Sequence, residues 1–195
     1  IAETHNPGFE SVPRLDLLFR PELTALGRLA PRAPLKAFPT TAAIDDAGDP
    51  PGRQSLDGEW AFMLVNAPEK APAGWTRGAG AGWRRIAVPG VWTRQQTNDL
   101  PIYTNFRMPF AEPSEPGGVP AKNPTGLYCT TFDPGDVAAG DDVILHVGGF
   151  ESMALVYLNG VFIGMGKDSR LPSEFDLTPF LRQGENALAV MVVKW

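Results

Sequence analysis

The clearest structural signal in the sequence is the stretch Ser152-Met-Ala-Leu-Val-Tyr-Leu158, followed by Asn159-Gly160 and then by Val161-Phe-Ile163. The two flanking segments are rich in β-branched and aromatic residues, which favour strands. Asn-Gly is preferred at a two-residue type I′ turn, because both central residues of that turn need a positive φ. The stretch therefore predicts a β-hairpin.

Further short strands are expected on both sides of this hairpin. They cover residues 60–65, 84–88, 127–132, 142–147 and 187–195, between turn signals. Residues 176–182 are expected to form a helix of one to two turns, with Asp176 as its N-cap and its end at Gly184. Strands at this spacing, without helical periodicity, predict an all-β protein, either an antiparallel β-sandwich or a jelly roll.

Composition agrees with this fold class. The 195 residues include 21 Gly and 20 Pro, about a fifth of the chain, where average usage is roughly 12%. Proline breaks helix interiors, so a long helical bundle is excluded. The proline-rich residues 109–124 are expected to form a long ordered loop. Hydrophobic residues make up 43% of the chain, which is enough for one core.

Charge and cysteine usage exclude several classes of protein. The net charge is −5 and no Lys/Arg run occurs, so a nucleic-acid binder is not expected. Cys129 is the only cysteine, which excludes an intramolecular disulfide and a cysteine-based zinc site. No apolar run reaches the roughly 20 residues that a membrane span needs, and no signal-peptide pattern opens the chain. We therefore expect a cytoplasmic protein that does not bind membranes.

The N-terminal part differs from the rest. Residues 1–52 hold eight prolines and are expected to form an extended arm that packs on the domain or on a partner, with a solvated linker as the alternative. Residues 53–195 are expected to form the β domain. Because the sequence starts at Ile1 and ends at Trp195 within an apolar run, we expect it to be trimmed at its start and cut within its last strand. The arm is too apolar for a free tail, as shown by Leu15, Leu17, Leu18, Phe19, Leu23, Leu26 and Leu29.

Nucleophile and base candidates are few. His5 lies in the arm and His146 in a predicted strand, where a position on a face of the sheet is favoured over a catalytic role. Cys129 has no basic neighbour in the sequence and is expected to be a structural thiol. Most of the tryptophans are expected in the core. A catalytic triad is therefore not predicted.

Carboxylates are the remaining candidates, because glycoside hydrolysis uses a pair of them. Asp168, Glu174 and Asp176 cluster in the polar residues 166–176. Asp176 has a capping role, and Glu174 can pair with Arg170 or with turn amides. Asp168 has no local structural role, which leaves it available as a contact for a ligand or a cation.

The run Asp168-Ser-Arg-Leu-Pro-Ser-Glu-Phe-Asp-Leu-Thr-Pro-Phe-Leu-Arg-Gln-Gly-Glu-Asn186 resembles the signature of the N-terminal sugar-binding domain of family 2 glycoside hydrolases, specifically lac-type β-galactosidases. The resemblance covers about residues 53–195. Four further segments agree in order, namely Ser55-Leu-Asp-Gly-Glu-Trp-Ala-Phe62, Val88-Pro-Gly-Val-Trp92, Pro101-Ile-Tyr-Thr-Asn105 and Asn123-Pro-Thr-Gly-Leu-Tyr128.

The resemblance implies a jelly-roll domain, like galactose-binding domains, that precedes immunoglobulin-like domains and a TIM barrel. Two barrel glutamates would act in a retaining mechanism, so no catalytic residue is expected in this chain, which would be inactive alone. Asp168 would touch the galactosyl hydroxyls and help to hold a sodium ion, and Asn105 would lie at the galactose subsite. Both roles suit a carboxylate and an amide. Magnesium is expected only in the barrel.

Some positions depart from the family pattern. Lys167 stands where the family usually has Gln, which places a cation beside the proposed ion ligand. Thr97-Asn98 replaces a Gly-aromatic pair, and Ala154 and Tyr157 replace bulkier aromatics. These departures bear on the substrate and on sodium dependence, not on the fold.

The expected function is that of a substrate-binding and scaffolding domain of a β-galactosidase-like hydrolase. Its partners would be a β-galactoside, the remaining domains of the enzyme and further copies in a homo-oligomer. A free-standing carbohydrate-binding module and a non-catalytic interaction domain are the alternatives.

Overall fold

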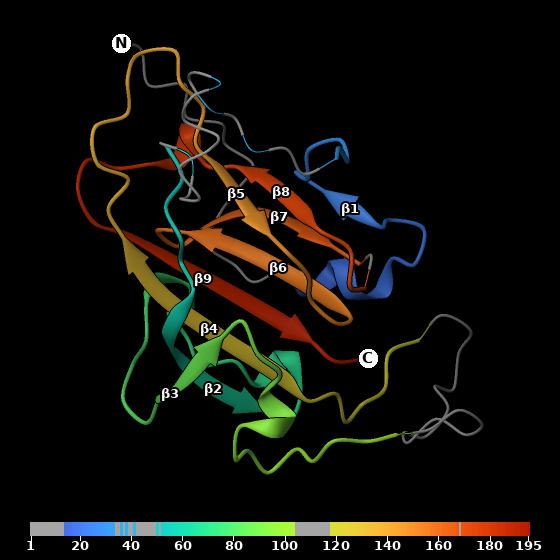
Figure 1. Ribbon diagram of the computed structural model, residues 1–195. Helices are drawn as coiled ribbons and strands as arrows, with labels where there is room; N and C mark the ends of the chain where they lie inside the picture. The colour runs from blue at the N-terminus through green and yellow to red at the C-terminus, as the bar shows by residue number, and fades with distance from the viewer. Residues whose placement is uncertain are drawn as a thin grey trace.

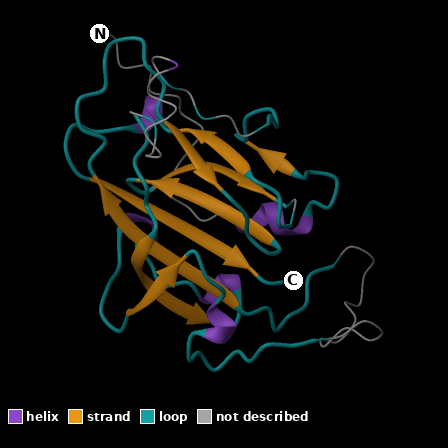
Figure 2. Ribbon diagram, in the orientation of Figure 1, coloured by secondary structure: helices purple, strands orange, loops and turns teal. Residues whose placement is uncertain are grey.

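A computed structural model describes residues 14–33, 36, 38, 41, 50, 52–103, 118–167 and 169–195. Nine strands in these residues form two antiparallel sheets, and the helices are short 3₁₀ segments (Figures 1 and 2). The strands are β1 (Ala25–Leu26), β2 (Gly58–Val65), β3 (Arg84–Val88), β4 (Thr125–Phe132), β5 (Ile144–Val147), β6 (Met153–Leu158), β7 (Val161–Gly166), β8 (Ser173–Asp176) and β9 (Asn186–Val193). The 3₁₀ segments are η1 (Leu15–Phe19), η3 (Pro68–Lys70), η4 (Trp75–Arg77), η5 (Trp92–Arg94) and η6 (Thr178–Phe180).

The larger sheet has the strand order β1-β7-β6-β9-β4-β2-β3, and the smaller one pairs β5 with β8. The predicted all-β sandwich is therefore confirmed, while its jelly-roll connectivity stays a prediction. No helix in the described part of the chain is long and apolar enough to cross a membrane.

The predicted hairpin is present as β6 and β7. Asn159 and Gly160 occupy the turn with φ of 54° and 85°, the positive values that a type I′ turn requires. A register shift between Val156 and Tyr157 interrupts the pairing of the two strands. β7 extends to Gly166, beyond the predicted end at Ile163, and β5 starts at Ile144 rather than at residue 142.

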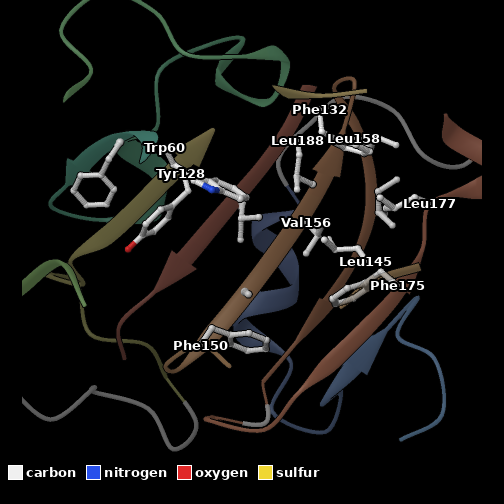
Figure 3. Packing of buried hydrophobic residues seen from close by; sticks show 14 of the residues in the cluster. Trp60, Tyr128, Phe132, Leu145, Phe150, Val156, Leu158, Phe175, Leu177 and Leu188 are labelled. Carbon is white, nitrogen blue, oxygen red and sulfur yellow. The ribbon is translucent and has the colours of Figure 1, made fainter. Parts of the chain in front are cut away.

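At its centre the larger sheet is buried on both faces. Alternate residues of a strand point to opposite sides, so a central strand contributes side chains to two separate cores. The inner core lies between the two sheets and includes Val156 of β6, Leu188 of β9 and Phe175 of β8 (Figure 3). The outer core covers the opposite face and includes Leu155 of β6. Every residue of β6 is buried, which explains the near-continuous apolar run in its sequence.

Gly126, at the second position of β4, marks a close approach within the inner core. A Cβ atom at this position would lie 2.9 Å from each of the rings of Phe62, Trp92 and Tyr128. The ring centroids of Phe62 and Tyr128 are 4.9 Å apart. Only glycine leaves room for this arrangement, which packs the loop containing Trp92 onto the sheet.

The described part of the arm contacts the domain directly. Leu17 and Leu18 of η1 are buried in the outer core. β1 pairs with the edge of β7, in the register Ala25 to Gly166 and Leu26 to Met165. Phe19 is 63% exposed, against the expectation for an apolar arm residue. The division between arm and domain at residues 52 and 53 stays a prediction, and residues 109–117 of the expected loop lie outside the described residues.

The predicted helix at 176–182 is wrong in extent. Only Thr178–Phe180 form a helical turn, and Leu181 is already extended. Asp176 is the last residue of β8, because it pairs with Ile144 of β5. The predicted N-cap is also wrong, because Leu177 occupies that position, although the Asp176 carboxylate accepts a hydrogen bond from the Thr178 backbone N–H at 2.9 Å.

Candidate functional site

Both residues that the sequence assigned to a sugar site, Asn105 and Asp168, lie outside the described residues. The described residues include 52–103, which end two residues before Asn105, and both neighbours of Asp168. The candidate site is therefore built from these flanking segments.

Lys167 follows β7 and connects it to the arm. Its backbone N–H donates to the Thr24 carbonyl at 2.8 Å. Its ammonium donates to the carbonyls of Leu17 and Arg20, at 2.7 Å each. Burial lowers the pKa of Lys167, although the nearby Glu22 carboxylate opposes this shift. The cation that departs from the family pattern is thus hydrogen-bonded to the backbone of the arm.

The segment after Asp168 is attached to the chain just before β6. The Arg170 backbone N–H donates to the Phe150 carbonyl at 2.8 Å, and its guanidinium binds both carboxylate oxygens of Glu151, at 2.6 and 3.1 Å. The hydrogen bond from Arg170 lowers the pKa of Glu151. Glu174 was predicted to pair with Arg170 or with turn amides, and the first of these pairings is wrong because Arg170 is bonded to Glu151.

Glu174 instead joins the arm to both strands of the smaller sheet. Its carboxylate accepts two hydrogen bonds from Arg32, at 2.8 and 3.0 Å, and lies 3.1 Å from Nδ1 of His146. Its register partner on β5 is the same His146, which is exposed on the face of the sheet as expected. The Leu29 backbone N–H donates to the Glu174 carbonyl at 2.8 Å. We call Arg32, His146 and Glu174 the Glu174 cluster.

A second polar cluster lies at the end of β9. The Asp99 carboxylate accepts a hydrogen bond from the Trp92 indole Nε1–H at 2.6 Å and two from the Lys194 ammonium, at 2.8 and 2.9 Å. The Asp99 and Lys194 side chains are only 13% and 14% exposed. The Thr97 hydroxyl donates to the Trp92 carbonyl at 3.0 Å within the same loop. We call Trp92, Asp99 and Lys194 the Asp99 cluster.

Ser152 joins the two flanking segments through this cluster. Its hydroxyl donates to the Lys194 carbonyl at 2.9 Å, and its backbone N–H donates to the Val193 carbonyl at 2.8 Å. The Ser169 hydroxyl lies 3.4 Å from the Ser152 carbonyl, a long contact. A series of polar contacts therefore runs from the segment beside Asp168, across the end of β9, to the loop that leads toward Asn105.

Asn123 completes this end of the molecule. Its side-chain amide is fully buried, donates to the Trp195 carbonyl at 2.7 Å and accepts from the Trp195 backbone N–H at 2.9 Å. Sequence reasoning missed both Asn123 and Asp99. Asn123 was noted only as the first residue of a segment that carries the family resemblance, and nothing local predicted a partner 72 residues away.

This end of the molecule also exposes apolar side chains from the loop at 91–103. Tyr103 is 91% exposed and Leu100 is 70% exposed. The tryptophans follow the expectation of core packing, because Trp60, Trp75 and Trp92 are buried. The exposed aromatic side chain of the loop at 91–103 is therefore Tyr103 and not Trp92.

Cys129 and the possible metal ligands were the remaining candidates. Cys129 is buried, its thiol donates to the Trp75 carbonyl at 3.4 Å, and burial raises its pKa to about 12. A thiol in that state is not a nucleophile at neutral pH. Within the described ranges, no group of three or more His, Cys, Asp or Glu side chains could hold a metal ion.

The family whose description reads "Glycosyl hydrolases family 2, sugar binding domain" matches residues 53–195. The β-galactosidase of Aeromonas hydrophila is 40% identical over 181 residues, which are 89% of this chain and 18% of that protein. A β-galactosidase of Enterobacter cloacae is 42% identical over 178 residues, 90% of this chain and 17% of that protein. The chain thus spans less than a fifth of the length of these curated relatives.

Solved structures agree with these relatives. The β-glucuronidase of Bifidobacterium dentium, complexed with coumarin-3-O-glucuronide, matches with a TM-score of 0.52 and 30% identity, over 71% of this chain and 19% of that chain. The β-glucuronidase of Faecalibacterium prausnitzii matches with a TM-score of 0.53 and 27% identity, over 71% and 20%. Because the family match runs from the segment before β2 to the last residue, and so includes every described strand but β1 as well as the Asp99 cluster, the chain belongs to the sugar-binding domains of family 2 glycosyl hydrolases.

Proposed function

We propose that this chain is the substrate-binding and scaffolding domain of a retaining β-galactosidase-like hydrolase. The observation that carries the proposal is the 40% identity to a β-galactosidase over 89% of the chain. The β-glucuronidase structure is 30% identical over 71% of the chain, which favours a galactoside over a glucuronide. The two catalytic glutamates belong to a barrel outside this chain, so the chain alone is inactive.

Asp168 and Asn105 are the proposed contacts to the galactosyl unit. A carboxylate accepts hydrogen bonds from sugar hydroxyls, and an amide can donate and accept at once. The support from the structure is that the segment beside Asp168 and the loop leading toward Asn105 are attached to the same end of β9 by Ser152 and the Asp99 cluster.

Sodium is a proposed ligand of the Asp168 carboxylate, because hard cations prefer oxygen ligands. The remaining oxygen ligands would come from the rest of the enzyme, and magnesium belongs to the barrel. Lys167 bears on this proposal through its position next to Asp168. Its ammonium donates hydrogen bonds to the carbonyls of Leu17 and Arg20. This supports a sodium site beside which the positive charge of Lys167 is bound by the arm.

The proposed partners are a β-galactoside, the remaining domains of the same polypeptide and further copies in a homo-oligomer, and the proposed location is the cytoplasm. The apolar side chains of Leu100 and Tyr103 support contact with another part of the enzyme at this end of β9.

The decisive experiment places this chain in the β-galactosidase of Aeromonas hydrophila, in exchange for the matching residues. The chimera is expected to hydrolyse a nitrophenyl β-galactoside and not the β-glucuronide. Asp168→Ala is expected to raise KM and lower kcat, with a loss in kcat/KM of roughly 10- to 100-fold, because a hydrogen bond to a charged group is worth about 1.5–3 kcal/mol. Asn105→Ala is expected to raise KM.

The matched control is Asp141→Ala, which removes an exposed carboxylate far along the chain from both residues. Unchanged kinetics in the Asp168→Ala chimera would remove Asp168 from the site. Preference for the glucuronide would overturn the proposed substrate class.

The chain by itself distinguishes this proposal from a free-standing carbohydrate-binding module. Galactose and a β-galactoside are titrated into the 195-residue chain by calorimetry. A composite site predicts no measurable heat of binding at millimolar sugar, whereas saturable binding would favour the module.

A further inference from the structure

A hollow of about 270 Å³ lies at the turn between β6 and β7, away from the candidate sugar site. It is lined by Arg77, Asn159, Gly160, Val161, Arg182 and Ala187. β9 runs antiparallel to β6, so this turn lies beside the start of β9, whereas the Asp99 cluster lies at its end (Figure 1). The six residues of β6 span roughly 20 Å. The hollow is therefore separate from the proposed sugar site.

Two guanidinium groups at this hollow have no carboxylate partner among the described residues. Neither Arg77 nor Arg182 forms an ion pair with any described residue. Other arginines, such as Arg32 and Arg170, are paired with glutamates. The protein carries a net charge of −5, and two cations without an ion pair to a described residue line this one hollow.

The side chain of Arg77 is positioned by the turn itself. A Cβ atom at Gly160 would lie 2.8 Å from Cγ of Arg77 and 3.1 Å from its Nε, so the stem of Arg77 lies against the bare backbone of Gly160. Arg77 belongs to η4, whose Trp75 is buried with its ring 5.3 Å from the ring of Tyr157. These contacts hold Arg77 at one wall of the hollow.

The backbone of Arg182 is held by the buried side-chain amide of Asn186. Its N–H donates to Oδ1 of Asn186 at 2.8 Å, and its carbonyl accepts from Nδ2 of Asn186 at 2.9 Å. Asn159 donates to the same Oδ1 at 2.8 Å and accepts from the Ala187 N–H at 3.0 Å. The amides of Asn159 and Asn186 are used in joining the hairpin turn to the turn that carries Arg182. For the side chains of Arg77 and Arg182 no hydrogen bond to a described residue is formed, so their guanidinium N–H groups are available as donors to a ligand.

We propose that this hollow binds a small oxyanion group, a phosphate or a carboxylate, between Arg77 and Arg182. Guanidinium groups present paired N–H donors that match the oxygens of both anions, and such charge-assisted hydrogen bonds are roughly twice as strong as neutral ones. Backbones that are already fixed lower the entropic cost of binding. The proposal depends on Arg77 and Arg182 alone and not on the galactoside assignment.

Inorganic phosphate is the first probe. It is titrated into the 195-residue chain at constant ionic strength, and ¹H–¹⁵N correlation spectra follow the backbone amides. Saturable shifts at Gly160, Val161 and Ala187 are expected, with a Kd of about 1 mM. Arg77→Gln and Arg182→Gln are each expected to weaken binding about tenfold. Arg94→Gln removes an exposed arginine of η5 and is expected to leave binding unchanged.

A second titration, with succinate in place of phosphate, distinguishes a carboxylate ligand from a phosphate ligand. Binding of succinate at the same amides with similar affinity supports a carboxylate ligand, and binding of phosphate alone supports a phosphate ligand. Linear shifts that do not saturate with either anion overturn the proposal. The same curve in wild-type and in the Arg77→Gln/Arg182→Gln variant also overturns it, whatever the result of the sugar experiments.

Discussion

The Asp99–Lys194 ion pair shows how much one contact can control at the scale of single residues. Each side chain is less than 15% exposed, and the Trp92 indole shares the same carboxylate. Because water has little access to this pair, removing one partner leaves the other charge unpaired. The resulting loss of stability is larger than the net contribution of the pair itself. The pair therefore decides whether the loop at 92–99 stays attached to the end of β9.

Asp99→Ala is expected to lower the free energy of unfolding by about 3 kcal/mol, because it leaves the Lys194 ammonium and the Trp92 N–H without their acceptor. Urea unfolding of the chain measures this change. Asp141→Ala is the control and is expected to change stability by less than about 0.5 kcal/mol. Equal stability of the two variants would show that the buried pair does not hold the loop.

At the scale of elements, the Glu174 cluster connects the arm, β5 and β8. Burial alone would raise the pKa of Glu174, but the hydrogen bonds from Arg32 and His146 outweigh it and hold the pKa below its ordinary value of 4.5. The unfolded chain therefore takes up the proton first as pH falls. The stability that the cluster contributes is present above about pH 4.5 and is lost below it.

The variant Glu174→Gln tests the direction of this pH dependence of stability. At pH 6 the wild type is expected to be more stable than the variant by about 1 kcal/mol, a modest value because Arg32 is mostly exposed. The difference is expected to shrink as the pH falls from 4.5 to 3. Urea unfolding at each pH gives this difference, in which the other carboxylates cancel. A difference that stays constant or grows toward low pH would contradict the assigned role.

Elements were predictable where their cause is local. The β6–β7 hairpin was expected from Asn159-Gly160, because the positive φ values belong to the turn itself. The helix at 176–182 was not, and the residue that precedes the observed turn is Leu177 and not the predicted N-cap Asp176. Pairing of Asp176 with Ile144 competes with the helix, and this pairing depends on a strand more than 30 residues earlier.

At the scale of the whole molecule, the described part of the arm packs on the outer face of the larger sheet. Leu17 is 1% exposed in the outer core, and β1 extends the sheet along β7. Lys167 joins the same arm to the segment beside Asp168. The described arm is therefore part of the folded domain and lies next to the candidate site.

Leu17→Ala is expected to destabilise the chain by about 2–4 kcal/mol, because it leaves a cavity in the outer core. The backbone carbonyl that Lys167 binds is retained in this variant, so the loss measures packing. Phe19→Ala, in the same 3₁₀ segment but 63% exposed, is the matched control and is expected to cost less than about 0.5 kcal/mol. Thermal or urea unfolding compares the two. Similar small losses in both variants would mean that the arm does not contribute to the core.

In the candidate site, as in the secondary structure, features with a local cause were predictable and contacts between distant segments were not. The motif around Asp168 marked one loop, and the motif ending at Asn105 marked another. That the segments flanking them meet through Ser152 and Lys194 could not be read from either motif. Asp99 and Lys194 are 95 residues apart, and neither has a local signal for a buried ion pair.

The sequence by itself determined the all-β class, the hairpin and the family, because turn chemistry, strand preference and motif order are written in neighbouring residues. Tertiary structure alone decided that Lys167 binds the arm, that Glu174 binds Arg32 and His146, and that one hollow is lined by two arginines that form no ion pair with a described residue. Each of these contacts joins segments brought together by strand order and register. Such pairings depend on the balance of burial and charge over the whole fold and not on the residues on either side.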